Sequence, residues 1–169
     1  MSKLKNIFDN YTWIGEVANK VIVEIKKTTE ILEEMHNVFF SEFNISSTKF
    51  NLMVILYNAP VEGLPLSEIG DQMLVTKANI TGLVDRLEKQ GYVERIRHSS
   101  DRRKIMASIT ENGRSFTEDV IKKYKIWSKD VLTILDDDDK ILLLKLFKKF
   151  QTGLINKKIS IERSNIHEF

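Results

Sequence analysis

Apolar side chains recur every three or four residues along the first quarter of the chain, over residues 11–43. They are Ile14, Val17, Val21, Ile25, Leu32, Met35, Phe39 and Phe43. This spacing predicts one long amphipathic helix, because residues three and four apart share a helix face. A helix of about 30 residues extends about 45 Å, which is longer than a small domain is wide. We therefore expect a second chain to cover part of its apolar stripe.

A shorter helix is predicted next, between the Ser and Thr capping candidates of "ISSTKF" and Pro60. Its expected apolar face is made of Phe50, Met53, Val54 and Tyr57. The segment "VEGLP", which follows this helix, is predicted to be a loop.

A helix-turn-helix arrangement follows, made of two short helices over residues 66–73 and 76–90. Ser67 is the expected N-cap of the first helix, and Thr76 is that of the second. Gly91 stands where a left-handed C-terminal cap belongs. The apolar face of the second helix is made of Ile80, Leu83, Val84 and Leu87.

Two strand-like runs, "YVERIR" and "KIMASIT", flank a polar tip directly after these helices. In the second run Ile105, Ala107 and Ile109 alternate with Met106 and Ser108. An alternation with a period of two predicts a β-hairpin with one buried face, so we expect these three residues to anchor the hairpin to the core.

The rest of the chain predicts two long helices. Thr110 caps the first of them. Its apolar side carries Phe116, Val120, Tyr124, Trp127 and Val131. Four consecutive aspartates, residues 136–139, precede "KILLLKLFKKFQTGLI", where they complement the dipole of the last helix. The string "DDDDK" also spells a protease-tag motif, but its position favours the capping role.

The composition excludes several classes of function. The 169-residue chain has about the length of one domain and contains no Cys, which excludes disulfides, thiol catalysis and Cys-based zinc sites. It has no run of about 18 apolar residues and no signal peptide, so we expect a cytoplasmic protein without a membrane partner. His36, His98 and His167 are far apart, and no nucleophile–base pair or phosphate loop occurs. We therefore expect no metal, no cofactor and no enzymatic activity.

Positive charge is concentrated on the second short helix and the hairpin. The net charge of the chain is only +2, but residues 76–104 hold eight basic and four acidic side chains. A basic patch on a nearly neutral body is typical of a protein that binds a polyanion. Lys77, Asn79 and Thr81 are candidates for contacts with base edges or phosphates. Arg86 is another candidate, unless it forms a local ion pair with Asp85.

The segment "NITGLVDRLEKQGYVERIRHSSDRRKIMASITENGRSF", residues 79–116, resembles the MarR family of winged-helix transcriptional regulators. The shared pattern is a helix ending in L-V-D-R-L-E-K-x-G, a strand, a D-R-R wing and a helix start similar to L-T-x-x-G. The likeness in architecture covers residues 11–157. It implies a mainly α fold with a small β-hairpin wing, in which residues 44–110 form a winged helix-turn-helix domain. Residues 1–43 and 111–169 would form a helical dimerisation region.

The resemblance also implies a sequence-specific DNA-binding regulator, namely a ligand-responsive repressor that acts as a homodimer on a pseudo-palindromic operator. Each protomer would place its recognition helix in a major groove and its wing over the adjacent minor groove. A winged-helix module that binds another protein, without specific DNA binding, stays open as the alternative, because fold alone does not decide function.

Duplex DNA is then the expected partner. Its expected contacts are Thr76, Lys77, Asn79, Thr81, Arg86, Arg97, Ser99, Arg102, Arg103 and Lys104. Guanidinium groups suit a narrow minor groove, so we expect Arg102 and Arg103 to lie there, with Asp101 orienting one of the arginines by a charge-assisted hydrogen bond. A solvated charge cluster is the alternative interpretation of this tip.

Two features leave alternatives open. The first is a ligand pocket, because the resemblance implies a small aromatic or phenolic effector. The residues expected to line this pocket are Phe39, Phe40, Met53, Tyr57, Tyr124 and Trp127. The alternative role of these residues is packing in the core.

The second is Gly82, which lies inside the recognition helix, where a Gly costs about 1 kcal/mol relative to Ala. Close approach of the helix backbone to DNA or to a neighbouring helix would each explain it.

Overall fold

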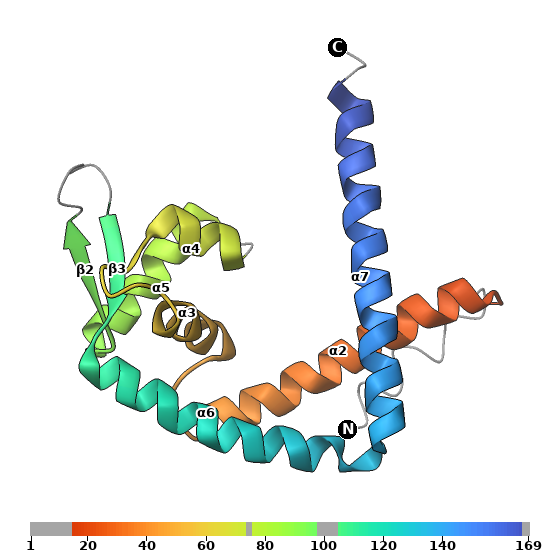
Figure 1. The fold of residues 1–169 in the computed structure, drawn as a ribbon, viewed down its shortest axis with the longest axis horizontal. Helices are drawn as coiled ribbons and strands as arrows, with labels where there is room; N and C mark the ends of the chain where they lie inside the picture. Colours follow the sequence, from red (N-terminus) through yellow and green to blue (C-terminus); the bar gives the residue numbers. More distant parts are fainter. Residues whose placement is uncertain (1–14, 74–75, 98–104, 167–169) are drawn as a thin grey trace. The chain divides into compact units, whose positions relative to one another are not determined.

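The computed structural model describes residues 15–73, 76–97 and 105–166, and most of them are helical. The elements are α2 (Val17–Ser41), α3 (Ser47–Tyr57), β1 (Leu64–Pro65), α4 (Leu66–Met73), α5 (Lys77–Lys89), β2 (Val93–Arg97), β3 (Ile105–Ile109), α6 (Glu111–Val131), a 3-10 turn (Leu132–Ile134) and α7 (Asp137–Ile166) (Figure 1). They form two compact units that divide between Ile121 and Lys122. The predicted fold class, mainly α with a small β element, is confirmed.

Capping side chains lie at the helix starts where the sequence predicts them, with one exception. The Ser46 and Thr76 hydroxyls accept hydrogen bonds from the backbone N–H three residues further on, at 3.3 and 3.4 Å, and the Asp136 carboxylate does the same at 2.8 Å. The exception is Ser67. Helix α4 begins at Leu66, directly after β1, so Ser67 lies inside the first helical turn and the prediction that it is the N-cap is wrong.

The end of α5 and the start of α6 meet at Thr110. Gly91, with φ +74°, closes α5 as the predicted left-handed cap, and the N–H groups of Gly91 and Tyr92 donate to carbonyls in the last turn at 2.9 and 3.0 Å. The Thr110 hydroxyl donates to the Gly91 carbonyl at 2.7 Å and accepts from the Gly113 N–H at 3.0 Å. A Cβ at Gly113 would lie 2.0 Å from the Tyr92 carbonyl oxygen, so the two backbones are in direct contact there.

Strand β3 is the centre of a three-stranded antiparallel sheet with the order β1–β3–β2. The segment predicted to be a loop supplies β1, because Leu64 and Pro65 pair with Ala107 and Met106. Gly63, with φ +76°, makes this pairing possible, since a Cβ there would lie 2.1 Å from the Ala107 carbonyl oxygen. The loop prediction is therefore wrong for these two residues.

This extra strand also overturns the prediction that β3 has one buried face. Met106, Ala107 and Ser108 are all buried in succession. Ile105 is 49% exposed, because it lies beyond the short β1 at the outer end of the hairpin, so its predicted anchoring role is wrong. The Ser108 hydroxyl is satisfied by donating to the Val61 carbonyl at 3.0 Å.

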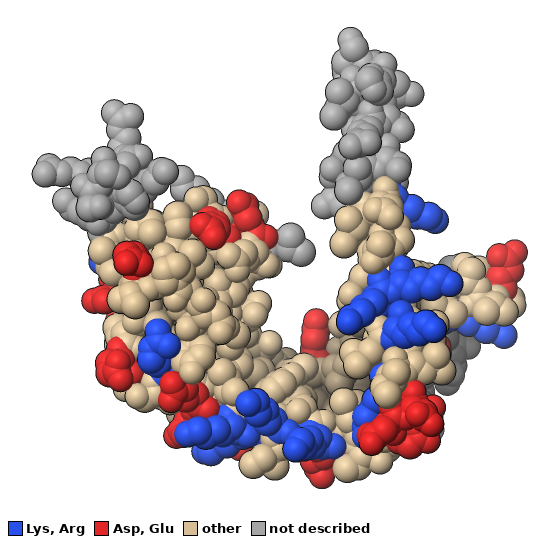
Figure 2. All heavy atoms as spheres, in the orientation of Figure 1, with Lys and Arg blue, Asp and Glu red and all other residues tan. Residues whose placement is uncertain are grey.

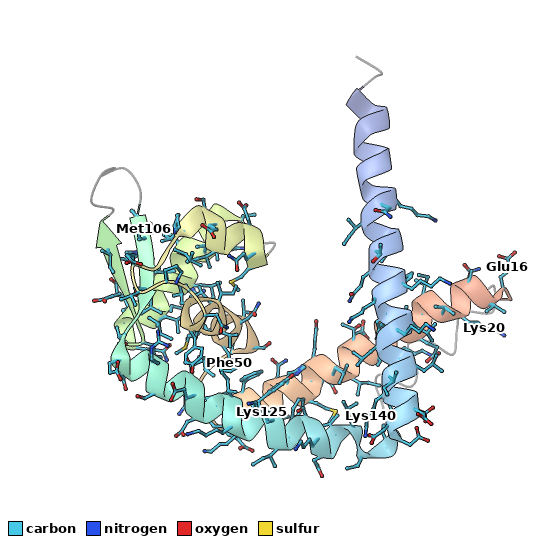
Figure 3. All side chains as sticks on the ribbon, in the orientation of Figure 1. Glu16, Lys20, Phe50, Met106, Lys125 and Lys140 are labelled. Carbon is cyan, nitrogen blue, oxygen red and sulfur yellow. The ribbon has the colours of Figure 1, made fainter. Side chains whose placement is uncertain are left out.

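The buried side of α3 differs from the predicted one, although Phe50 points into the core of the first unit in both (Figure 3). The buried side chains of this helix are Phe50, Leu52, Met53 and Leu56. Val54 and Tyr57, which were predicted on the buried face, are only half-buried. Helix α3 contacts α2, α4 and β3, so it needs apolar side chains on several sides rather than on one.

Helices α2 and α7 carry apolar side chains that this chain leaves exposed. In α2 they are Val17, Val21, Ile22, Ile31, Leu32, Met35 and Val38. In α7 they are Ile141, Leu142, Leu143, Leu144, Leu146, Phe147, Leu154 and Ile155. Figure 2 shows acidic side chains gathered at the start of α7 and lysines further along it. No helix in the described part of the chain is long and apolar enough to cross a membrane.

The first helix is also shorter than the predicted span of 11–43. It begins at Val17, and it ends at Ser41 because residues 42–44 form a turn in which Asn44 has φ +53°. Residues 11–14 lie outside the described part of the chain.

Candidate nucleic-acid interface

Helices α4 and α5 contact each other as a helix-turn-helix, and α5 has one buried and one exposed side. The predicted apolar face is buried, because Ile80, Leu83, Val84 and Leu87 are each 7% exposed or less. Asn79, Thr81 and Arg86 are exposed, as residues that contact DNA must be. Thr76 is exposed too and caps the helix, and Lys77 is the first helical residue.

An open hollow of about 320 Å³ lies between α5 and the start of α3. Its lining residues are Ser46, Thr48, Asn79, Leu83 and Arg86. The sequence did not indicate this hollow, because Ser46 and Thr48 are distant from α5 along the chain. The exposed polar surface is therefore wider than α5 alone.

Gly82 lies between Asn79 and Arg86, three and four residues away on the same side of α5. A Cβ at Gly82 would meet the guanidinium nitrogens of Arg86 at 3.7 and 3.9 Å, which is an ordinary contact distance. Apart from the neighbouring backbone of α5 itself, nothing else among the described residues lies within 4 Å of that position, so no described helix provides a packing reason for this glycine.

Arg95, in the middle of β2, joins the hairpin to α5. Its guanidinium forms ion pairs with Asp85 and with Glu88, the latter at 2.9 Å, and it donates to the Thr81 carbonyl at 3.3 Å. The alternative ion pair between Asp85 and Arg86 is therefore wrong. Within the described part of the chain Arg86 has no ion-pair partner.

The hairpin places Arg97 at the outer end of β2, opposite Ile105. The remaining residues of the predicted wing lie outside the described part of the chain, and they are Ser99, Asp101, Arg102, Arg103 and Lys104. Their positions at a minor groove, and the pairing of Asp101 with an arginine, stay predictions.

The aromatic and Met residues predicted to line an effector pocket are divided between the two units. Phe39, Phe40 and Met53 are buried in the core of the first unit, where the two phenyl rings lie 5.1 Å apart. Tyr124 and Trp127 belong to the second unit, and their rings lie 5.2 Å apart. A ligand-binding role for them stays a prediction.

Tyr57, the sixth of these residues, is held by α6. Its hydroxyl donates to Glu118 Oε1 at 3.0 Å, and the guanidinium carbon of Arg114 lies 4.9 Å from the ring centroid. The hydrogen bond to Glu118, with desolvation and the negative charge of Glu118, raises the pKa of Tyr57 above its usual value of 10.0. Burial likewise raises the pKa of Tyr124.

The residues that the structure describes include no group of three His, Asp or Glu side chains close enough to hold a metal ion. His36 stacks on Phe40, with 6.0 Å between the ring centroids, which is a packing contact. His98 and His167 lie outside the described residues.

Comparison with known proteins gives consistent results. Residues 45–105 match the sequence profile of the MarR family. The transcriptional repressor YetL of Bacillus subtilis is 30% identical over 121 residues, which cover 72% of this chain and 70% of YetL. YetL is named as a transcriptional repressor rather than as an enzyme, as the sequence predicted.

Two solved structures share the fold. The DNA complex of MepR from S. aureus has a TM-score of 0.70 at 14% identity, over 78% of this chain and 96% of that one. A structure of BpsR from Bordetella bronchiseptica, which concerns the regulation of its DNA binding by 6-hydroxynicotinic acid, has a TM-score of 0.64 at 15% identity, over 76% of this chain and 98% of that one.

Proposed function

The chain belongs to the MarR family of transcriptional regulators, and we propose that it is a sequence-specific DNA-binding repressor that acts as a homodimer on a pseudo-palindromic operator. In this proposal residues 44–110 form the DNA-binding domain, and residues 1–43 and 111–169 supply the helices of the dimer. Helix α5 enters the major groove, and the tip of the hairpin lies over the adjacent minor groove.

The exposed side of α5 carries the proposal. Asn79 and Arg86 are of the types that read adenine and guanine through paired hydrogen bonds, and Gly82 adds no side chain between them. The opposite side is fixed in the core by apolar side chains. Recognition of base edges requires a helix that is fixed in position and has a polar exposed side.

The exposed apolar side chains of α2 and α7 support the homodimer. Val17 of α2 is 77% exposed, and Ile141 of α7 is 65% exposed. Monomeric soluble proteins seldom leave extended apolar surface in contact with water. In a two-fold dimer both α5 helices meet one side of the duplex only if the half-site centres are about 10 bp apart, or a multiple of that.

A small aromatic acid or phenol is the proposed effector. The regulation of BpsR by 6-hydroxynicotinic acid supports this class of ligand. Tyr57, Tyr124 and Trp127 are half-buried, so they are the most accessible of the six candidate residues. An effector relieves repression only if it binds two dimer geometries with unequal affinity.

Selection of bound sequences from random duplex DNA tests the proposed function. We expect a pseudo-palindromic consensus with half-sites about one helical turn apart. Equal binding to every duplex, or none at moderate salt, would favour the protein-interaction alternative instead. For the effector, thermal-shift screening with phenols and aromatic acids should find at least one stabilising ligand, and no stabilisation by any of them would contradict that part.

A further inference from the structure

We propose that Arg95 is a positioning residue that holds the recognition helix in a fixed rotation on the hairpin and makes no contact with DNA itself. The inference rests on the proposed function, because it concerns how α5 is presented to the groove. Arg95 and its partners Thr81, Asp85 and Glu88 are named the Arg95 clamp below.

The clamp spans two turns of α5. Thr81, Asp85 and Glu88 are four and three residues apart, so they form one stripe about 10 Å long on the helix. The guanidinium of Arg95 reaches all three, through two carboxylates and one backbone carbonyl. Because the donors of a guanidinium are planar and fixed in direction, these acceptors define the rotation of α5 as well as its distance from β2.

Glu88 holds the same strand at a second point. Its Oε1 accepts the backbone N–H of Arg95 at 3.2 Å, and its Oε2 accepts the guanidinium at 2.9 Å. Strand β2 is an edge strand, so a carboxylate from α5 occupies a backbone donor that a further strand would otherwise use. Loss of the Arg95 side chain leaves this backbone hydrogen bond in place, and we expect the fold to persist.

The clamp also neutralises Arg95. Its single positive charge faces the negative charges of Asp85 and Glu88, and its side chain is 26% exposed. A phosphate near the guanidinium would be repelled by both carboxylates. Without these three groups, residues 76–104 still hold seven basic and two acidic side chains. The positive charge available to DNA therefore lies on other residues.

The stripe of the clamp lies beside the side of α5 that carries Asn79, Gly82 and Arg86. Rotation of the helix would move Asn79 and Arg86 away from the base edges, while lysines and arginines elsewhere still attract the phosphates. Loss of the clamp should therefore reduce discrimination between sequences more than it reduces attraction to DNA in general.

The test measures binding of the full-length chain to two duplexes over a range of salt concentrations. One duplex is the operator selected by the wild type, and the other is a scrambled sequence of the same composition. For Arg95→Ala we expect the ratio of the two affinities to fall about tenfold, with an unchanged salt dependence. Arg97→Ala, on the same strand, is the matched control. We expect it to weaken both duplexes alike and to reduce the salt slope by about 0.9, as for one lost phosphate contact.

Two outcomes would overturn the clamp. One is a reduced salt slope in Arg95→Ala, equal to that of Arg97→Ala, and the other is an unchanged affinity ratio. Asp85→Asn keeps every basic residue and should also lower the ratio of the affinities for the two duplexes. It therefore tests the positioning role of Arg95 if Arg95→Ala does not fold. The double variant Arg95→Ala/Asp85→Asn should discriminate between the two duplexes as well as Arg95→Ala alone does. A wild type that does not distinguish the two duplexes contradicts the proposed function, whereas a preference that Arg95→Ala retains contradicts only the clamp.

Discussion

Helices α5 and α7 are both rich in apolar residues, but α5 buries them within its own chain whereas α7, over its described side chains, leaves most of them exposed. Ile80, Val84 and Leu87 of α5 are 0% exposed, whereas Ile141 and Leu144 of α7 are 65% and 60% exposed. Helix α5 is therefore held in place by its own domain, whereas the exposed apolar surface of α7 is the one that we propose a second chain covers. Substitutions in α5 should change intrinsic folding stability, and those in α7 should change association, which depends on protein concentration.

The largest effect is expected for Leu87→Ala in α5. Removal of a fully buried leucine side chain should lower the free energy of unfolding by about 2–5 kcal/mol. Urea denaturation at two protein concentrations checks this, and the loss should be the same at both. Lys89→Ala, an exposed change in the same helix, should alter stability by about 0.5 kcal/mol or less. A loss for Leu87→Ala that grows on dilution would break the comparison with α7.

In α7, Leu144→Glu should weaken the dimer by at least about tenfold, because it places a carboxylate on an apolar surface that the partner would bury. Sedimentation velocity over a dilution series measures the effect. Gln151→Glu adds the same charge at an exposed polar position of the same helix and should leave the dimer intact. If both variants dimerise equally well, α7 is not the surface that a second chain covers.

Gly82→Ala should move stability and binding in opposite directions. A Cβ at this position meets no obstacle in the fold, so the substitution should stabilise α5 by up to about 1 kcal/mol. We expect operator affinity to fall about tenfold, because the added methyl group separates the helix from the groove. Thermal unfolding and operator titration of one preparation check both effects. A more stable variant with unchanged affinity would remove the reason given for this glycine.

The smallest effect is expected for Tyr57→Phe, at the contact between α3 and α6. The raised pKa of Tyr57 means that the folded state favours the neutral hydroxyl. This contribution is present below the usual pKa of 10.0 and is lost as the pH rises through the folded-state pKa. Thermal unfolding from about pH 8 to about pH 11 should show the variant and the wild type converging at high pH. Curves that stay parallel would show that the hydroxyl is not linked to stability.

Helix α5 was predictable because its signals are local. The cap at Thr76, the apolar period and the terminal Gly91 all lie within one short segment, and the structure confirms each of them. The MarR motif in the same segment then allowed the family to be predicted. The exposed side of α5 was predicted at the same time, since it is made of the polar residues that lie between the apolar positions.

The Arg95 clamp and strand β1 were not predictable, because each depends on side-chain or backbone contacts between two different elements. Leu64 becomes a strand residue only by pairing with Ala107, and two residues are too few to show a period. Arg95 was counted as part of the basic patch, although its charge is taken up by Asp85 and Glu88. A count of charges contains no information on which partners they face.

The Thr110 hydroxyl couples local opening at the end of α5 to local opening at the start of α6. One hydroxyl oxygen donates to the Gly91 carbonyl at the end of α5 and accepts from the Gly113 amide at the start of α6. Neither helix end can open at this point without releasing the hydroxyl. The amide hydrogens of Tyr92 and Gly113 should therefore exchange with solvent at a common rate, as members of one cooperative unit.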